Sequence, residues 1–181
     1  MNTLCKMKIF TKILDVDLPA GSKSETINLS FDDRKRGRLK IVTDSGNDAG
    51  IQIERGLVLR HGTVLATEND EYLTVFASDE KVSTAYVKDS TLFARGCYHL
   101  GNRHVPLQIG EGFLRFQEDY VLDDMLHGLG IHVTHEQAPF EPENGAYAPG
   151  TGGHHHHGEE GHSHSHSHDN DNDGHSHGHS H

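Results

Sequence analysis

The last 28 residues of this 181-residue chain contain twelve histidines and, apart from glycine, no apolar residue. Such a segment cannot bury a core, so with the Gly-rich residues before it we expect residues 148–181 to form a flexible linker and a disordered His-rich tail. Folding is thereby restricted to about 150 residues, enough for one typical domain or two small ones. The tail histidines are His154, His155, His156, His157, His162, His164, His166, His168, His175, His177, His179 and His181.

The spacing of these histidines indicates a metal-binding tail. In residues 162–168 and 175–181 a donor stands at every second position, so an extended backbone presents repeated bidentate clamps. Neutral imidazole suits Ni(II), Cu(II), Zn(II) and Co(II) alike. A purification tag is the competing interpretation, but tags are usually one uninterrupted run of histidines, whereas Ser, Gly, Asp and Asn interrupt this tail.

The net charge of -11 limits the classes of partner. The tail has five acidic residues and no Lys or Arg, so it contributes -5 and the remainder contributes -6. An acidic chain argues against nucleic acid, which needs a basic face, and we interpret the basic run at 34–38 as a solvated strand edge. No apolar run approaches the roughly 20 residues of a membrane span, and no signal peptide is evident. We therefore expect a cytoplasmic protein without membrane contact.

Changes in hydrophobic periodicity predict an α+β chain with two folded domains. Short alternating strands predict a small all-β domain at residues 1–72, with strands at 7–16, 26–31 and 39–42 and two more between 49 and 65. Residues 73–147 follow the order β-α-β-β-α-β, that of a ferredoxin-like domain. Its expected elements are a strand at 73–77, helical segments at 80–86 and 90–100, strands at 107–109 and 114–116, a helix at 119–129 and a strand at 131–134.

His104 lies at a predicted helix-to-strand corner. Gly101 and Asn102 are residue types that end helices, and Pro106 pushes Val105 towards an extended backbone. An imidazole at such a corner points away from the core and remains accessible. A lone histidine there would ordinarily be a surface or capping residue, but the donor-rich tail favours a ligand. We therefore predict that His104 binds metal.

Several ordered motifs resemble one protein family. They are Tyr98-His99-Leu100-Gly101-Asn102-Arg103-His104, then Asp119-Tyr120-Val121-Leu122-Asp123-Asp124-Met125-Leu126, then Ala138-Pro139-Phe140-Glu141-Pro142-Glu143-Asn144-Gly145-Ala146-Tyr147. Residues 34–38 and 50–56 fit the N-terminal pattern of the same family. Together these motifs resemble the urease accessory protein E family, the nickel metallochaperones of urease maturation, over nearly the whole chain ahead of the tail.

The resemblance implies a fold, a metal site and partners. The first domain is expected to be similar to the peptide-binding part of J-domain co-chaperones, and the second to bind metal and form a homodimer. His104 and its symmetry mate are expected to form an interfacial Ni(II) site that tail histidines complete. The implied partners are the urease accessory GTPase and, through it, apo-urease with its other accessory proteins. Pairing of dimers on metal loading is left open.

One departure from the family pattern concerns secondary metal sites. Family members often carry further histidines at positions that are occupied here by Phe116, Gln117, Glu118 and Tyr120. His127, His132 and His135 lie nearby in the sequence, and solvent exposure is the default interpretation of each.

The pattern of nucleophiles and bases predicts a carrier rather than an enzyme. No Ser/His/Asp or Cys/His arrangement presents itself, and His135-Glu136 lacks the second histidine of a zinc hydrolase motif. Cys5 and Cys97 form neither a metal-binding pair nor a disulfide framework, so we interpret Cys97 as a small core residue. The alternative to nickel delivery is storage or detoxification of divalent metal by the tail. A polypeptide-binding role of the β domain is compatible with delivery.

Overall fold

The computed structural model describes residues 7–14, 18–19 and 21–145, which all fall within one compact unit. The tail histidines, Cys5, motif residues 146–147 and the predicted linker lie outside the described residues. No helix in this part of the chain has the length and the apolar surface needed to cross a bilayer.

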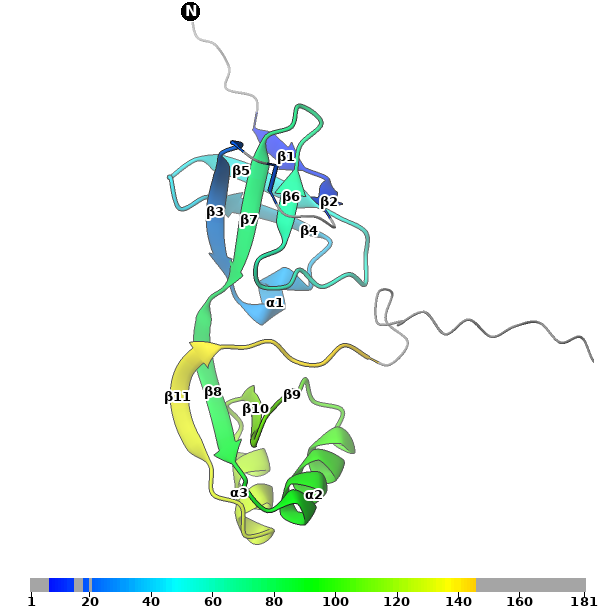
Figure 1. The fold of residues 1–181 in the computed structure, drawn as a ribbon, viewed down its shortest axis with the longest axis vertical. Helices are drawn as coiled ribbons and strands as arrows, with labels where there is room; N and C mark the ends of the chain where they lie inside the picture. Colours follow the sequence, from blue (N-terminus) through cyan, green and yellow to red (C-terminus); the bar gives the residue numbers. More distant parts are fainter. Residues whose placement is uncertain (1–6, 15–17, 20, 146–181) are drawn as a thin grey trace, which may run out of the picture. The chain divides into compact units, whose positions relative to one another are not determined.

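The first region, up to residue 77, contains two small sheets (Figure 1). The three-stranded sheet has the order β1-β5-β4, and the four-stranded sheet has the order β2-β6-β7-β3. Apolar side chains of both sheets, among them Phe10, Leu65 and Val75, share one buried core. The strands are β1 (Lys8–Phe10), β2 (Lys12–Leu14), β3 (Ser24–Leu29), β4 (Arg38–Val42), β5 (Asp48–Gln52), β6 (Val64–Ala66) and β7 (Tyr72–Ala77).

Two of the expected strands in this region have different bounds. The strand expected at 7–16 is divided at Thr11, whose N–H donates to the carbonyl of Ala66 at 3.0 Å. The strand expected at 26–31 ends at Leu29, and a single helical turn, α1 (Phe31–Arg34), follows it. The Ser30 side chain caps this turn by accepting a hydrogen bond from the Asp33 N–H at 3.2 Å.

The second region has the predicted order β-α-β-β-α-β. Its four strands form an antiparallel sheet with the order β11-β8-β10-β9. Both helices pack on this sheet through one core, to which Leu100, Leu114 and Leu126 belong. The elements are β8 (Asp79–Tyr86), α2 (Ser90–Gly101), β9 (Gln108–Gly110), β10 (Phe113–Gln117), α3 (Tyr120–Gly128) and β11 (Thr134–Pro139).

The first strand of this sheet is β8, not the predicted strand at 73–77. β7 pairs in parallel with β3 and therefore belongs to the first region. The helix predicted at 80–86 is wrong, because these residues lie in β8, between β10 and β11. Residues 82–85 are all buried, as in a central strand that is covered on both faces. The junction between the two regions is at Ser78, whereas the sequence predicted it after residue 72.

The basic run at 34–38 contains one buried residue. The Arg34 side chain is 0% exposed, whereas that of Arg36 is 60% exposed. The Arg34 guanidinium donates to the carbonyl oxygens of Leu29 (3.3 Å), Leu59 (3.1 Å) and Phe140 and to the carboxylate of Glu141. The expected solvated edge is therefore wrong for Arg34, which joins segments far apart in the sequence.

Replacing Arg34 with alanine should lower the free energy of unfolding by about 3–5 kcal/mol, because three carbonyl groups and Glu141 lose a shared donor. Urea denaturation followed by circular dichroism measures this change. The control, Arg36→Ala, removes an exposed arginine of the same run and should change the free energy by less than about 0.5 kcal/mol. Equal effects of the two substitutions would contradict the role assigned to Arg34.

Candidate metal centre

Helix α2 and the turn after it position His104. Asp89 caps the first turn of α2 by accepting a hydrogen bond from the Leu92 N–H at 2.7 Å, and Leu100 anchors the last turn in the core. The chain then turns tightly, and the His104 N–H donates to the carbonyl of Gly101 at 3.0 Å. His104 is exposed, which confirms the prediction of an accessible histidine at a helix-to-strand corner.

The backbone of His104 adopts the left-handed conformation, with φ of 54°. This conformation costs an L-residue about 1–2 kcal/mol, so the surrounding structure must hold it. Beyond the turn, Leu107 is buried, and its carbonyl accepts a hydrogen bond from the Glu143 N–H at 2.8 Å. The Gln108 side chain accepts one from the Glu141 N–H at 3.0 Å. The turn is therefore anchored by α2 before it and by residues 141–143 after it.

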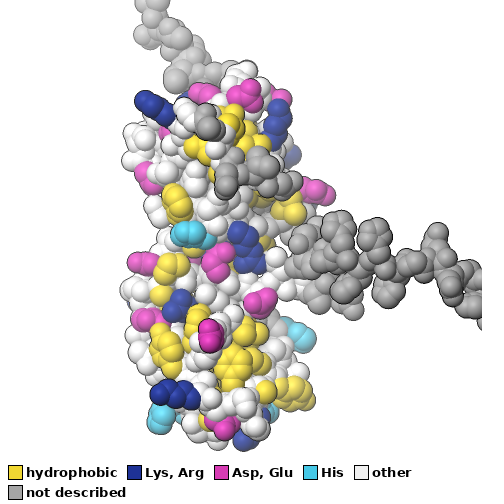
Figure 2. All heavy atoms as spheres, viewed as in Figure 1, with side chains coloured by type: hydrophobic (Ala, Val, Ile, Leu, Met, Phe, Trp, Pro, Cys, Tyr) yellow, Lys and Arg dark blue, Asp and Glu magenta, His cyan; other side chains and the backbone are white. Residues whose placement is uncertain are grey.

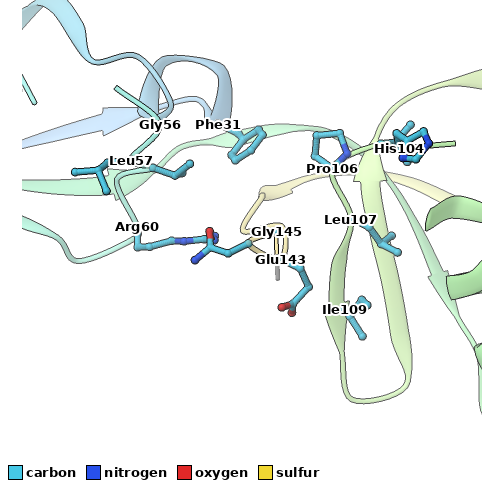
Figure 3. A pocket seen from close by; sticks show the side chains of 13 residues that line it. Phe31, Gly56, Leu57, Arg60, His104, Pro106, Leu107, Ile109, Glu143 and Gly145 are labelled. Atoms are coloured by element: carbon cyan, nitrogen blue, oxygen red, sulfur yellow. The ribbon is translucent and has the colours of Figure 1, made fainter. Parts of the chain in front are cut away.

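A cavity of about 670 Å³ lies beside this turn, and His104 is one of its lining residues. Most of the lining is apolar, and Arg60 and Glu143 contribute charged groups. In Figure 3, Pro106 lies between Phe31 and His104, which places the imidazole at one end of the cavity. A ligand can therefore approach His104 from solvent.

From the part of the chain that the structure describes, His104 supplies a single donor. No three side chains of His, Cys, Asp or Glu come together there in the manner of a metal cluster. The Cys97 thiol is half-buried against the core of the second region, and burial raises its pKa above the usual value. Thiolate is the form that binds metal, so the raised pKa of Cys97 disfavours it as a ligand. Its packing against the core agrees with the predicted role of a small core residue.

The three histidines at and beyond the end of α3 have different surroundings. His127, His132 and His135 are all exposed, as expected. His135, however, is tied to the buried Asp123: its Nε2 lies 2.8 Å from the Asp123 Oδ2, and this hydrogen bond raises the pKa of His135. The sequence did not predict this pair, because no local pattern shows that β11 brings His135 to Asp123.

Charges of both signs are mixed on the surface that Figure 2 shows. Lys8 pairs with Glu25, Lys12 with Glu68 and Lys35 with Asp32, at 3.0, 2.9 and 2.6 Å. These ion pairs, and the mixture of charges on the face in Figure 2, contrast with the clustered basic side chains that nucleic-acid binding needs.

Both regions of the chain match models of a known family. The model of the UreE urease accessory protein N-terminal domain matches residues 10–78, and that of the C-terminal domain matches residues 80–181. The matched ranges meet at the junction that the sheets define.

Full-length relatives agree with these matches. Urease accessory protein UreE of Teredinibacter turnerae is 52% identical over 131 residues, which cover 72% of this chain and 84% of that protein. The protein of the same name from Pseudomonas putida strain F1 is 55% identical over 125 residues, 68% of this chain and 75% of the relative. That of Shewanella halifaxensis is 48% identical over 140 residues, 77% of each.

These matches define the class, an accessory chaperone of urease maturation. Such proteins assist the maturation of urease, and the class implies metal handling. The chain belongs to the UreE family of urease accessory proteins.

Replacing His135 with alanine should destabilise the protein more at about pH 5.5 than at about pH 9. The pKa of His135 is raised in the folded state, so protonation favours folding. The stabilisation is complete below the unfolded pKa of about 6.5 and is lost as the pH rises through the folded value. Urea midpoints at both pH values measure the effect, with His132→Ala as the control for loss of an exposed imidazole. A larger effect of His135→Ala at the higher pH would contradict the pairing.

Proposed function

We propose that this protein is a nickel metallochaperone that delivers Ni(II) to apo-urease through the urease accessory GTPase complex. The observation that carries the proposal is His104, an exposed imidazole on a turn anchored from both sides. A donor on a fixed backbone defines where a metal is presented, which a donor on a flexible tail does not. Membership of a urease accessory family supports apo-urease as the recipient of the metal.

A homodimer completes the proposed site. One imidazole is an incomplete ligand set, whereas a two-fold axis provides a second His104 at a spacing fixed by folded surfaces. The strand order β11-β8-β10-β9 supports a ferredoxin-like second domain, through which we propose that the dimer forms. Tail histidines, from His154 to His181, then fill the remaining positions.

Flexible ligands suit a carrier, which must both collect the metal and release it. Tail histidines that exchange rapidly let a recipient replace them one at a time, while His104 keeps the metal at a defined place. Imidazole alone does not select nickel, because Cu(II) binds more tightly and Zn(II) and Co(II) also accept nitrogen donors. The assignment of nickel therefore rests on the family and on the metal supply of the cytoplasm.

Storage or detoxification is the second candidate function, and the twelve tail histidines favour it. In a storage protein the tail holds the metal and His104 makes no specific contribution. In a delivery protein His104 forms a site that differs from the tail sites in stoichiometry and affinity. The two functions therefore predict different titrations.

Nickel titration of three proteins separates these functions: the full chain, a chain ended at Gly153, and the shortened chain with His104→Ala. We expect the shortened chain to lose most of the capacity but to keep about one tight site per two chains, and His104→Ala to abolish that site. Light scattering reports the oligomeric state in parallel. A shortened chain that binds no nickel would leave the tail as the metal-binding element, whereas a tight shared site that survives His104→Ala would show that His104 does not form it.

The nickel capacity of the full chain should fall steeply between about pH 7 and pH 5, because free imidazoles are protonated below about pH 6.5 and then cannot bind metal. Equilibrium dialysis against Ni(II) in buffers of equal ionic strength measures the capacity. Unchanged capacity at about pH 5 would show that carboxylates, rather than histidines, hold the metal.

A further inference from the structure

His127 and His132 form a pair of neighbouring imidazoles that the proposed centre does not use. Their ring centroids are 6.5 Å apart and their planes are inclined by 56°. Two imidazoles that bind one metal ion at about 2.1 Å have centroids about 5 Å apart at tetrahedral or square-planar angles. Because both side chains are exposed, an approach of about 1–2 Å needs only side-chain rotation, which is fast.

The backbone between the two histidines is fixed by the motif that ends α3. Gly130, with φ of 83°, donates to the carbonyl of His127 at 2.9 Å, and the Ile131 N–H donates to the carbonyl of Leu126 at 2.9 Å. This pair of hydrogen bonds, with glycine in the left-handed conformation, is a Schellman motif.

Buried residues anchor both ends of this motif. Leu126 is 0% exposed and Ile131 is 2% exposed, and they share the core of the second region. His127 directly follows Leu126, and His132 directly follows Ile131. The fold therefore fixes the backbone positions of both histidines before any ligand arrives.

We propose that His127 and His132 together chelate one divalent transition-metal ion of the class that prefers imidazole, such as Ni(II), Cu(II), Zn(II) or Co(II). No third His, Cys, Asp or Glu joins them among the described residues, so water or a ligand from another molecule fills the other positions. His135 does not take part, because its Nε2 is held by Asp123. The site is therefore open and exchangeable.

This site goes beyond the proposed delivery function, because it needs neither His104 nor the tail. Its ligands come from one chain, so it also needs no dimer. It places an exchangeable metal on the folded part of the protein, at the end of α3.

The test uses a full-length chain in which the tail histidines are serines and His104 is alanine. Calorimetric titration with NiCl₂ at about pH 7.5, where imidazole is mostly neutral, should give about one Ni(II) per chain. His127→Ala and His132→Ala should each raise the Kd by on the order of 100-fold, because loss of either donor abolishes chelation. The double substitution should also remove the residual binding by the one imidazole that each single variant keeps.

The matched control is His99→Ala, which removes a histidine of α2 and should leave the Kd unchanged. The proposal is overturned if the starting chain, with tail serines and alanine at 104, does not bind Ni(II). It is also overturned if either His127→Ala or His132→Ala leaves the Kd unchanged. NMR offers a second measurement in the same starting chain: the imidazole signals of His127 and His132 should broaden together at substoichiometric Ni(II), before that of His99. Broadening of only one of the two also overturns it. Because His104 is absent from this chain, the outcome is independent of the delivery site.

Discussion

The buried guanidinium of Arg34 is the interaction on which the described structure most depends. A buried cation without partners costs several kcal/mol, so its acceptors must be held in place. One of them, the Phe140 carbonyl, begins the segment that follows β11, and Arg60 holds the same segment through the Pro142 carbonyl at 2.7 Å. The Glu143 N–H in turn fixes the carbonyl of Leu107, just beyond the turn that carries His104. Hydrogen bonds to residues 140–143 therefore connect the buried arginine of α1 with Leu107, three residues beyond the candidate metal ligand His104.

The sequence predicted the position and exposure of His104 more accurately than it predicted the strands around it. Gly101, Asn102 and Pro106 act on their immediate neighbours, and the corner at His104 depends on such local preferences. In α3, Leu122 and Leu126 are spaced by about one helical turn, and this spacing predicts the face of the helix that packs on the sheet. Local signals of this kind are sufficient to predict the position and the exposure of His104.

Features that depend on distant partners were not predictable. Residues 82–85 lie in a central strand because β10 and β11 flank them, and no property of these four residues shows that pairing. Arg34 is buried because Leu59 and Phe140 direct their carbonyls at it, whereas its sequence neighbours are charged and exposed. The pairing of His135 with Asp123 likewise depends on a tertiary contact between different elements of the chain. In each case tertiary contacts override what the local pattern favours.

The proposed function assigns different tasks to the tail histidines and to His104. The many tail donors would give capacity, and the single donor on an anchored turn would give position. A storage protein needs only the first property, while a protein that hands metal to a specific recipient needs both. The left-handed backbone of His104, kept despite its conformational cost, is consistent with a requirement for position.

The most direct measurement is urease activation at limiting nickel, in cells that lack their own copy of this protein and are supplied with the native chain or with its His104→Ala variant. Both chains keep all twelve tail histidines, so they have nearly equal metal capacity. A delivery site at His104 predicts that the variant activates urease no better than cells without the protein, and that added nickel restores activity. Activation by the variant equal to that of the native chain would show that the tail suffices and that His104 is not the delivery site.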